Sequence, residues 1–208
     1  MNRAAVTSLL VFLLLVGLAW YLSDLQSTPP PAPTGTGSAE LSTLTIAPEG
    51  KMAGYSRDRF PHWSSQGNSC DTREIVLQRQ GADVRTDKSC KATAGKWTSP
   101  YDAVVVTDAG DVDIDHTVPL AEAWRSGADK WTDDDRAKFA NDLGGIQLLA
   151  TTAASNRSKG DQDPGKWKPP VRSYWCTYAT HWVQVKNTYK LTIDQAEHDA
   201  LASMLAAC

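Results

Sequence analysis

Residues 111–120, DVDIDHTVPL, place carboxylates and an imidazole within one short segment. Its acidic residues alternate with apolar ones, and His116 directly follows Asp115. A carboxylate is a hard oxygen ligand for Mg²⁺ or a similar ion, while a histidine with an ordinary pKa of ~6.5 can accept a proton from water near neutral pH. Hydrolysis of a phosphodiester uses both functions, a metal ion on the phosphate oxygens and a base on the attacking water. The segment therefore suits a metal-dependent hydrolytic site.

A second polar cluster, SNRSKGD, occupies residues 155–161. Asn156 could supply an amide oxygen as a second metal ligand, and Lys159 follows it one helical turn later. Lys159 and Arg157 are candidate phosphate contacts, with the solvated end of a helix as the structural alternative. Arg73 is a candidate for contact with the scissile phosphate, because its guanidinium fork matches phosphate oxygens. A structural salt bridge is the alternative for Arg73.

Capping signals and apolar patterns predict the elements that must position these residues. Thr132 precedes three acidic residues, which favours the start of a helix. Asp194 and Glu197 have the spacing of a capping box. Predicted helices cover residues 69–80, 120–125, 132–141, 153–159, 178–189 and 194–207, and predicted strands cover residues 103–107, 111–117 and 146–151. The fold class that we expect is α+β.

The N-terminal part of the chain has the composition of an export segment followed by a linker. Residues 4–22 are almost continuously apolar, and at ~1.5 Å per residue a helix of this length nearly crosses a hydrocarbon core of about 30 Å. Residues 1–22 are therefore predicted to be either a cleaved signal peptide or a signal-anchor helix that tethers the protein to the outer face of the membrane. Residues 23–45, rich in Pro, Thr, Gly and Ser, are the predicted linker. Residues 46–208 are the predicted folded domain.

All four cysteines, Cys70, Cys90, Cys176 and Cys208, follow the N-terminal segment and the predicted linker. An even number in an exported chain favours two disulfides, for which three connectivities are possible. Pairing between sequence neighbours, Cys70–Cys90 and Cys176–Cys208, is the connectivity that we expect. A zinc site is the alternative, but the chain has no C-x-x-C pair.

Several segments together resemble the HNH (ββα-metal) nucleases, and more narrowly the exported DUF1524 group related to the nuclease part of GmrSD restriction enzymes. The matching segments are YSRDRFPHW, CDTREIVL, DIDHTVPLAEAWRSGADKW, FAND, ASNRSKGDQDPGKWKPP and WCTYATHWVQVKNTYKL, which span most of the chain after about residue 50. The resemblance implies a ββα-metal core with extra helices. It also implies that Asp115 and Asn156 bind a divalent metal ion and that His116 is the general base.

The chain departs from the family pattern at the middle position of the HNH motif. That position is usually an Asn whose side-chain oxygen orients the catalytic histidine. The family spacing lands on Gln147, which can make the same hydrogen bond with one more methylene, so we expect Gln147 to orient His116. Asn141 is the competing candidate, although the predicted helix places it at a C-terminal end, where Asn often serves as a cap.

These features predict a metal-dependent, non-specific endonuclease that acts outside the cytoplasm, with DNA as the favoured substrate and RNA as the alternative. The net charge of −3 argues against a strongly basic, high-affinity nucleic-acid binder, but a nuclease must release its products. Oxygen ligands favour Mg²⁺ or Mn²⁺, with Zn²⁺ as an alternative. Two other functions stay open: a metal-dependent hydrolase of cell-wall material and a non-catalytic binding module. No protein partner is evident from the sequence.

Overall fold

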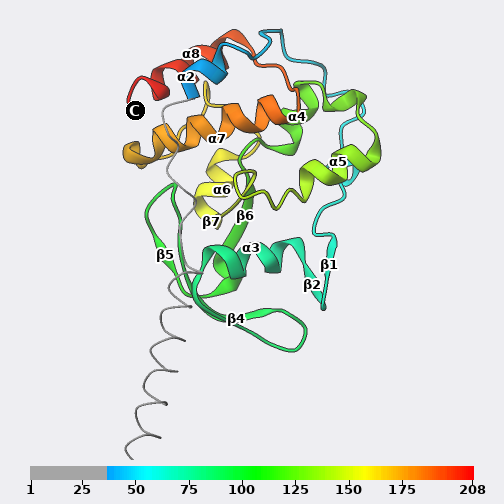
Figure 1. Cartoon of the computed structure of the whole chain (residues 1–208), viewed down its shortest axis with the longest axis vertical. Helices are drawn as coiled ribbons and strands as arrows, with labels where there is room; N and C mark the ends of the chain where they lie inside the picture. The colour runs from blue at the N-terminus through cyan, green and yellow to red at the C-terminus, as the bar shows by residue number, and fades with distance from the viewer. Residues whose placement is uncertain (1–36) are drawn as a thin grey trace, which may run out of the picture. The chain divides into compact units, whose positions relative to one another are not determined.

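The computed structural model describes residues 37–208, and Figure 1 shows how their helices and strands are arranged. The predicted export segment, residues 1–22, lies outside this range, as does most of the predicted linker, residues 23–45. Among the described helices, none combines the length and apolarity needed to cross a membrane.

A short helix, α2 (Gly37–Leu41), lies within the range predicted to be linker. It packs against α7 (Trp175–Thr188) and α8 (Gln195–Leu205) and buries Leu41. The side chain of Asn187 on α7 donates a hydrogen bond of 3.0 Å to the carbonyl oxygen of Glu40. The folded domain therefore includes residues that precede the predicted boundary at residue 46.

The middle of the fold is an antiparallel pair of strands, β6 (Val112–His116) and β7 (Leu148–Thr152), and β7 is followed by α6 (Ala153–Lys159). Its register pairs Val112 with Thr152 at one end and His116 with Leu148 at the other. The side chain of Thr152 caps α6 by accepting a hydrogen bond from the Ser155 amide. Strand β7 therefore passes into α6 without a loop, and the three elements lie together (Figure 1).

Alternate residues of this strand pair lie in two different apolar cores. Ile114 and Leu148 belong to a core shared with α3 (Thr72–Gln80) and β4 (Ala92–Thr98). Leu149 belongs to a larger core formed mainly by the helices α4 (Leu120–Arg125), α5 (Asp133–Ala140), α7 and α8. This two-residue alternation is that of a strand buried on both faces.

The structure confirms the predicted helices, with small shifts at their ends. Helix α3 begins at Thr72 rather than at residue 69, because Asp71 is its N-cap and Cys70–Asp71 forms the strand β2. The capping box of α8 uses Asp194 and Glu197 as predicted. The remaining helical bounds are η1 (Arg57–Arg59), η2 (Ala109–Asp111), η3 (Ala128–Lys130) and η4 (Arg172–Tyr174).

A three-stranded sheet of order β3-β4-β5 was not expected from the sequence, apart from its last strand. Its bounds are β3 (Ala82–Thr86), β4 (Ala92–Thr98) and β5 (Val105–Val106), and a separate strand β1 (Ser65–Gly67) pairs with β2. Strand β3 is mostly exposed and carries no clear apolar alternation, so its residues lack the pattern from which a strand is predicted.

Two disulfides, Cys70–Cys90 and Cys176–Cys208, confirm the predicted connectivity. The first joins the start of α3 to the turn between β3 and β4, and the second joins α7 to the segment after α8. The described part of the chain contains no free cysteine.

Candidate active site

The predicted catalytic segment ends in an open pocket of about 300 Å³. The C-terminal end of β6, the start of α4 and the end of α6 contribute to its walls. Its polar lining residues are Tyr55, Arg57, Asp115, His116, Asn156, Arg157 and Asp161. The structure therefore brings Asp115, His116 and Asn156 to one place, although Asn156 is far from the other two in the sequence.

His116 is held by a hydrogen bond at one edge of its ring. Its Nε2 lies 2.9 Å from the carbonyl oxygen of Ala140. Because a carbonyl oxygen only accepts, Nε2 carries the proton and Nδ1 is the basic nitrogen. Burial lowers the pKa of His116 to about 3, against the raising effect of the Ala140 hydrogen bond. The ring is therefore neutral near pH 7.

Asp115 is buried in an ion pair with Lys159. Its carboxylate lies 2.8 Å from Lys159 Nζ and accepts a hydrogen bond of 2.7 Å from the hydroxyl of Tyr101. Burial raises the pKa of Asp115, although Lys159 and the Tyr101 hydrogen bond both oppose the rise. The carboxylate is held in a fixed position at the wall of the pocket.

The prediction that Lys159 contacts a phosphate is wrong for this arrangement. Its side chain is 0 % exposed, and Nζ also donates a hydrogen bond of 2.8 Å to the carbonyl oxygen of His116. The lysine lies one turn after Asn156 on α6, on the side that packs against β6. It is therefore an internal counter-ion for Asp115.

Asn156 is oriented by the neighbouring acid of β6. Its Nδ2 donates a hydrogen bond of 2.9 Å to Asp113 Oδ2. This contact fixes which end of the amide is the nitrogen and leaves the amide oxygen as the acceptor. Asn156 and Asp115 line the same pocket, and each offers hard oxygen lone pairs of the kind that Mg²⁺ and Mn²⁺ bind. The two side chains are thus oxygen donors of the type that would suit a divalent ion, and the Asp115 oxygens also accept hydrogen bonds from Lys159 and Tyr101.

The prediction that Gln147 orients the His116 ring is wrong. The side chain of Gln147 is fully buried and accepts a hydrogen bond of 3.1 Å from the Val118 amide. It donates a second one of 3.0 Å to the Val118 carbonyl oxygen. Gln147 thus holds the segment between β6 and α4, and the ring of His116 is oriented by a backbone carbonyl instead.

Asn141 is the C-cap of α5, as the helix pattern predicted. Its Oδ1 accepts hydrogen bonds of 2.8 Å from the Ser64 amide and from the Thr72 hydroxyl. Its Nδ2 donates one of 2.7 Å to the Pro61 carbonyl oxygen. The side chain therefore ties the 61–64 loop to the end of α5 and the start of α3.

The structure supports the structural alternative for Arg73. Its Nη2 donates to the carbonyl oxygens of Ala109 and Val112, at 2.8 and 3.1 Å, and its Nη1 lies 3.0 Å from Glu74. Arg73 therefore fixes the turn that leads into β6. It does not belong to the lining of the pocket, and the prediction that it contacts the scissile phosphate is wrong.

Arg57 and Trp63 belong to this site but were not singled out as site residues from the sequence. Arg57 is exposed and lines the pocket, as the predicted phosphate residue Arg157 also does. Within residues 37–208, neither arginine forms an ion pair with a carboxylate. The Trp63 ring stacks on His116, with centroids 5.9 Å apart and an interplanar angle of 22°. The signal that could have found both is YSRDRFPHW, where basic and aromatic residues alternate closely.

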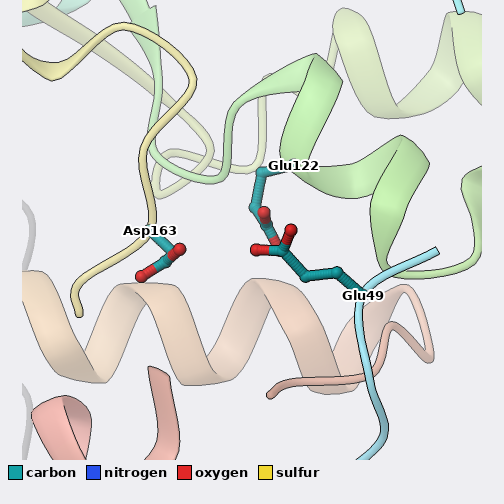
Figure 2. Close-up of side chains that lie close together, drawn as sticks. All are labelled: Glu49, Glu122 and Asp163. Carbon is teal, nitrogen blue, oxygen red and sulfur yellow. The ribbon is translucent and has the colours of Figure 1, made fainter. Parts of the chain in front are cut away.

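A second group of acids lies outside this pocket. Figure 2 shows that the carboxylates of Glu49, Glu122 and Asp163 lie close together, within 4.8 Å of one another. Arg125 forms ion pairs with Glu122, at 3.0 Å, and with Glu49. Lys166 forms ion pairs with Asp163, at 2.6 Å, and also with Glu49. Because cations of the protein already neutralise these acids, the group serves to join the loop after α6 to α4.

Comparison with known proteins identifies the family of the chain. Residues 65–204 match the family described as "GmrSD restriction endonucleases, C-terminal domain". A protein of Arthroderma benhamiae, named only as an uncharacterized secreted protein, is 52% identical over 189 residues, which cover 88% of this chain and 93% of that protein. No solved structure matches the chain. The chain belongs to the family of GmrSD restriction endonuclease C-terminal domains, and its function is of the nuclease type.

Proposed function

We propose that this protein is a metal-dependent HNH-type endonuclease that hydrolyses phosphodiester bonds of nucleic acid outside the cytoplasm. The observation that carries the proposal is the state of His116 at the end of β6. Its protonated nitrogen is engaged by Ala140, its ring is neutral, and it lines a pocket shared with Asp115 and Asn156. The order of two antiparallel strands and a helix, β6-β7-α6, is also that of a ββα-metal core.

The residues of the pocket divide the work of hydrolysis among them. Nδ1 of His116 takes a proton from the attacking water as the new P–O bond forms and the bond to the leaving oxygen breaks. Arg57 and Arg157 bind the phosphate oxygens through guanidinium groups that have no carboxylate partner. Asp115 and Asn156 would hold a Mg²⁺ or Mn²⁺ ion, which supplies positive charge to the phosphate when it is bound.

Nothing in the pocket provides a means of reading a base sequence. Its polar lining consists of carboxylates, an amide, a phenol, an imidazole and two arginines at a strand end, without a helix placed for insertion into a groove. We therefore propose cleavage without sequence preference, with DNA as the favoured substrate.

Export of the protein is part of the proposal. Two disulfides in a domain of this size are typical of proteins that fold in an oxidising compartment. The relative from Arthroderma benhamiae is named as secreted. The apolar segment 4–22 would provide the signal.

The test uses the purified full chain with its disulfides formed, incubated with DNA and with RNA in the presence of Mg²⁺, Mn²⁺, Zn²⁺ or chelator. We expect cleavage that chelator abolishes. His116→Ala should lower turnover by ~10²–10⁴-fold, since this is what a general base contributes. The matched control is His198→Ala, because the His198 ring hydrogen-bonds to the neighbouring Asp199, at 3.1 Å, and does not line the pocket.

The other outcomes of this experiment decide against the proposal. Cleavage at the parent rate by His116→Ala would remove the histidine from catalysis. Nucleic-acid binding without cleavage under any metal would indicate a binding module. Release of fragments from cell-wall material, with nucleic acid left intact, would indicate the alternative hydrolase.

A further inference from the structure

The 61–64 loop contains a tryptophan in an unusual backbone conformation. Trp63 has a φ of 60°, in the left-handed region that residues with a side chain rarely adopt. Such conformations persist where the surrounding structure imposes them, and they gather at functional sites. The position of the Trp63 ring is therefore a product of the contacts around the loop.

Asn141 imposes this conformation from both sides of Trp63. Its amide binds the Pro61 carbonyl oxygen at 2.7 Å and the Ser64 amide at 2.8 Å, so the loop closes on one side chain. The Ser64 carbonyl oxygen accepts a further hydrogen bond of 3.0 Å from the Thr72 amide at the start of α3. The loop is thus held by two helices that belong to the body of the domain.

The end of α5, Ala140 and Asn141, restrains both the edge and the face of the His116 ring. Ala140, which precedes Asn141, accepts the hydrogen bond from Nε2 and fixes one edge of the ring. Trp63, which Asn141 holds in place, stacks on the face of the ring with centroids 5.9 Å apart. A hydrogen bond alone leaves the imidazole free to rotate about that contact, and a stacked indole removes this freedom.

We infer that Trp63 is a positioning residue, which Asn141 holds against the His116 ring so that Nδ1 stays directed at the pocket. This inference rests on the proposed nuclease function for its effect on turnover, but the placement of the ring can be measured separately. Misplacement of a catalytic group by about 1 Å can lower turnover by ~10²-fold.

The experiment compares Trp63→Ala, Trp63→Phe and the parent full chain. We expect Trp63→Ala to lower kcat by ~10²-fold with an unchanged KM, and Trp63→Phe to restore most of the turnover because a phenyl ring can still stack. Trp175→Ala is the matched control, since Trp175 is also partly buried but contacts Lys168 and Arg172 instead of His116. An unchanged kcat, or a higher KM at unchanged kcat, in Trp63→Ala would overturn the inference.

Nuclear magnetic resonance of the labelled histidine ring supplies the readout that is independent of activity. In the parent, the indole ring current should shift the ring protons of His116, and both Trp63→Ala and Asn141→Ala should abolish this shift. Unchanged His116 signals in Trp63→Ala would overturn the inference even if kcat falls. If the parent cleaves no nucleic acid, the proposed function fails, and the His116 signals of Asn141→Ala, which keeps the indole, then decide whether the loop holds Trp63 against the ring.

Discussion

Two lysines of this protein are fully buried, and each forms an ion pair with carboxylates, yet they lie in different surroundings. Lys186 on α7 lies between Glu122 and Glu197, at 2.8 and 3.1 Å. Its Nζ also donates to the Ser126 hydroxyl and to the Thr192 carbonyl oxygen, at 2.7 and 2.9 Å. This lysine joins α4, α7 and α8 within the helical region.

Lys159 on α6 binds one carboxylate, that of Asp115, and the carbonyl oxygen of His116. Both of these residues line the pocket. The two lysines share burial and ion pairing, so these properties alone do not mark a functional site. What distinguishes the β6 end is that the partner of the lysine also faces an open pocket beside a neutral histidine.

We expect the largest changes in stability and activity from replacing each lysine by Met. Either change leaves a buried carboxylate without its cation, so the free energy of unfolding should fall by ~3–5 kcal/mol in both variants. Lys159→Met should also lower the turnover of the folded fraction, because Asp115 loses the group that holds it. Urea unfolding and the activity of the native fraction measure the two quantities. Equal turnover of the two folded variants would contradict the distinction drawn between the lysines.

Gln147 sharpens the comparison, since it is buried beside the pocket but serves structure. Gln147→Ala leaves the amide and the carbonyl of Val118 without partners, and at ~1–3 kcal/mol for each group the free energy of unfolding should fall by ~2–6 kcal/mol. The tautomer of His116, observed by nitrogen chemical shifts, should not change. Gln184→Ala is the control, because Gln184 is only partly buried on α7 and should change stability by less than about 0.5 kcal/mol. A change of tautomer in Gln147→Ala would restore the orienting role.

His181 tests the helical region through its pH dependence. Burial lowers the pKa of His181 to about 4, below the ordinary ~6.5. The folded state therefore binds fewer protons than the unfolded state, and stability is lost as the pH falls from ~6.5 toward about 4. Between pH 7 and pH 5 this loss should amount to about 2 kcal/mol.

The measurement for His181 compares urea unfolding of the parent and His181→Leu at both pH values. His116 contributes equally to the pH dependence of stability in the two proteins, so its contribution cancels when they are compared. The variant should lose less stability on acidification than the parent. A stability difference that stays constant from pH 7 to pH 5 would show that the pKa of His181 is not lowered in the folded state.

Much of the site could be predicted because its main residues lie in short segments with strong local signals. Asp115 and His116 are adjacent, and Asn156 follows a capped strand-to-helix junction at Thr152. The capping residues Thr132 and Asp194 predicted the starts of α5 and α8. Pairing each cysteine with its neighbour in the sequence predicted the two disulfides, among the three connectivities that four cysteines allow.

The rest depends on contacts between segments distant in sequence. Spacing in the sequence predicts that Gln147 contacts His116 and that Lys159 contacts a phosphate. In the structure both side chains are buried, and they contact Val118 and Asp115 instead. The residue that orients His116 contributes a backbone carbonyl, which carries no signature in its side chain. Trp63 reaches the ring through a loop closed by a side chain 77 or more positions later.

The Cys70–Cys90 disulfide has a consequence for survival among proteases. Asp87, Lys88 and Ser89 are exposed in the turn between β3 and β4, a place where proteases cut readily. A cut after Lys88 falls inside the covalent loop from residue 70 to residue 90, so neither fragment can leave. Since β4 carries the buried Trp97, the nicked protein keeps both the strand and its share of the core. A reducing agent would separate the same two pieces.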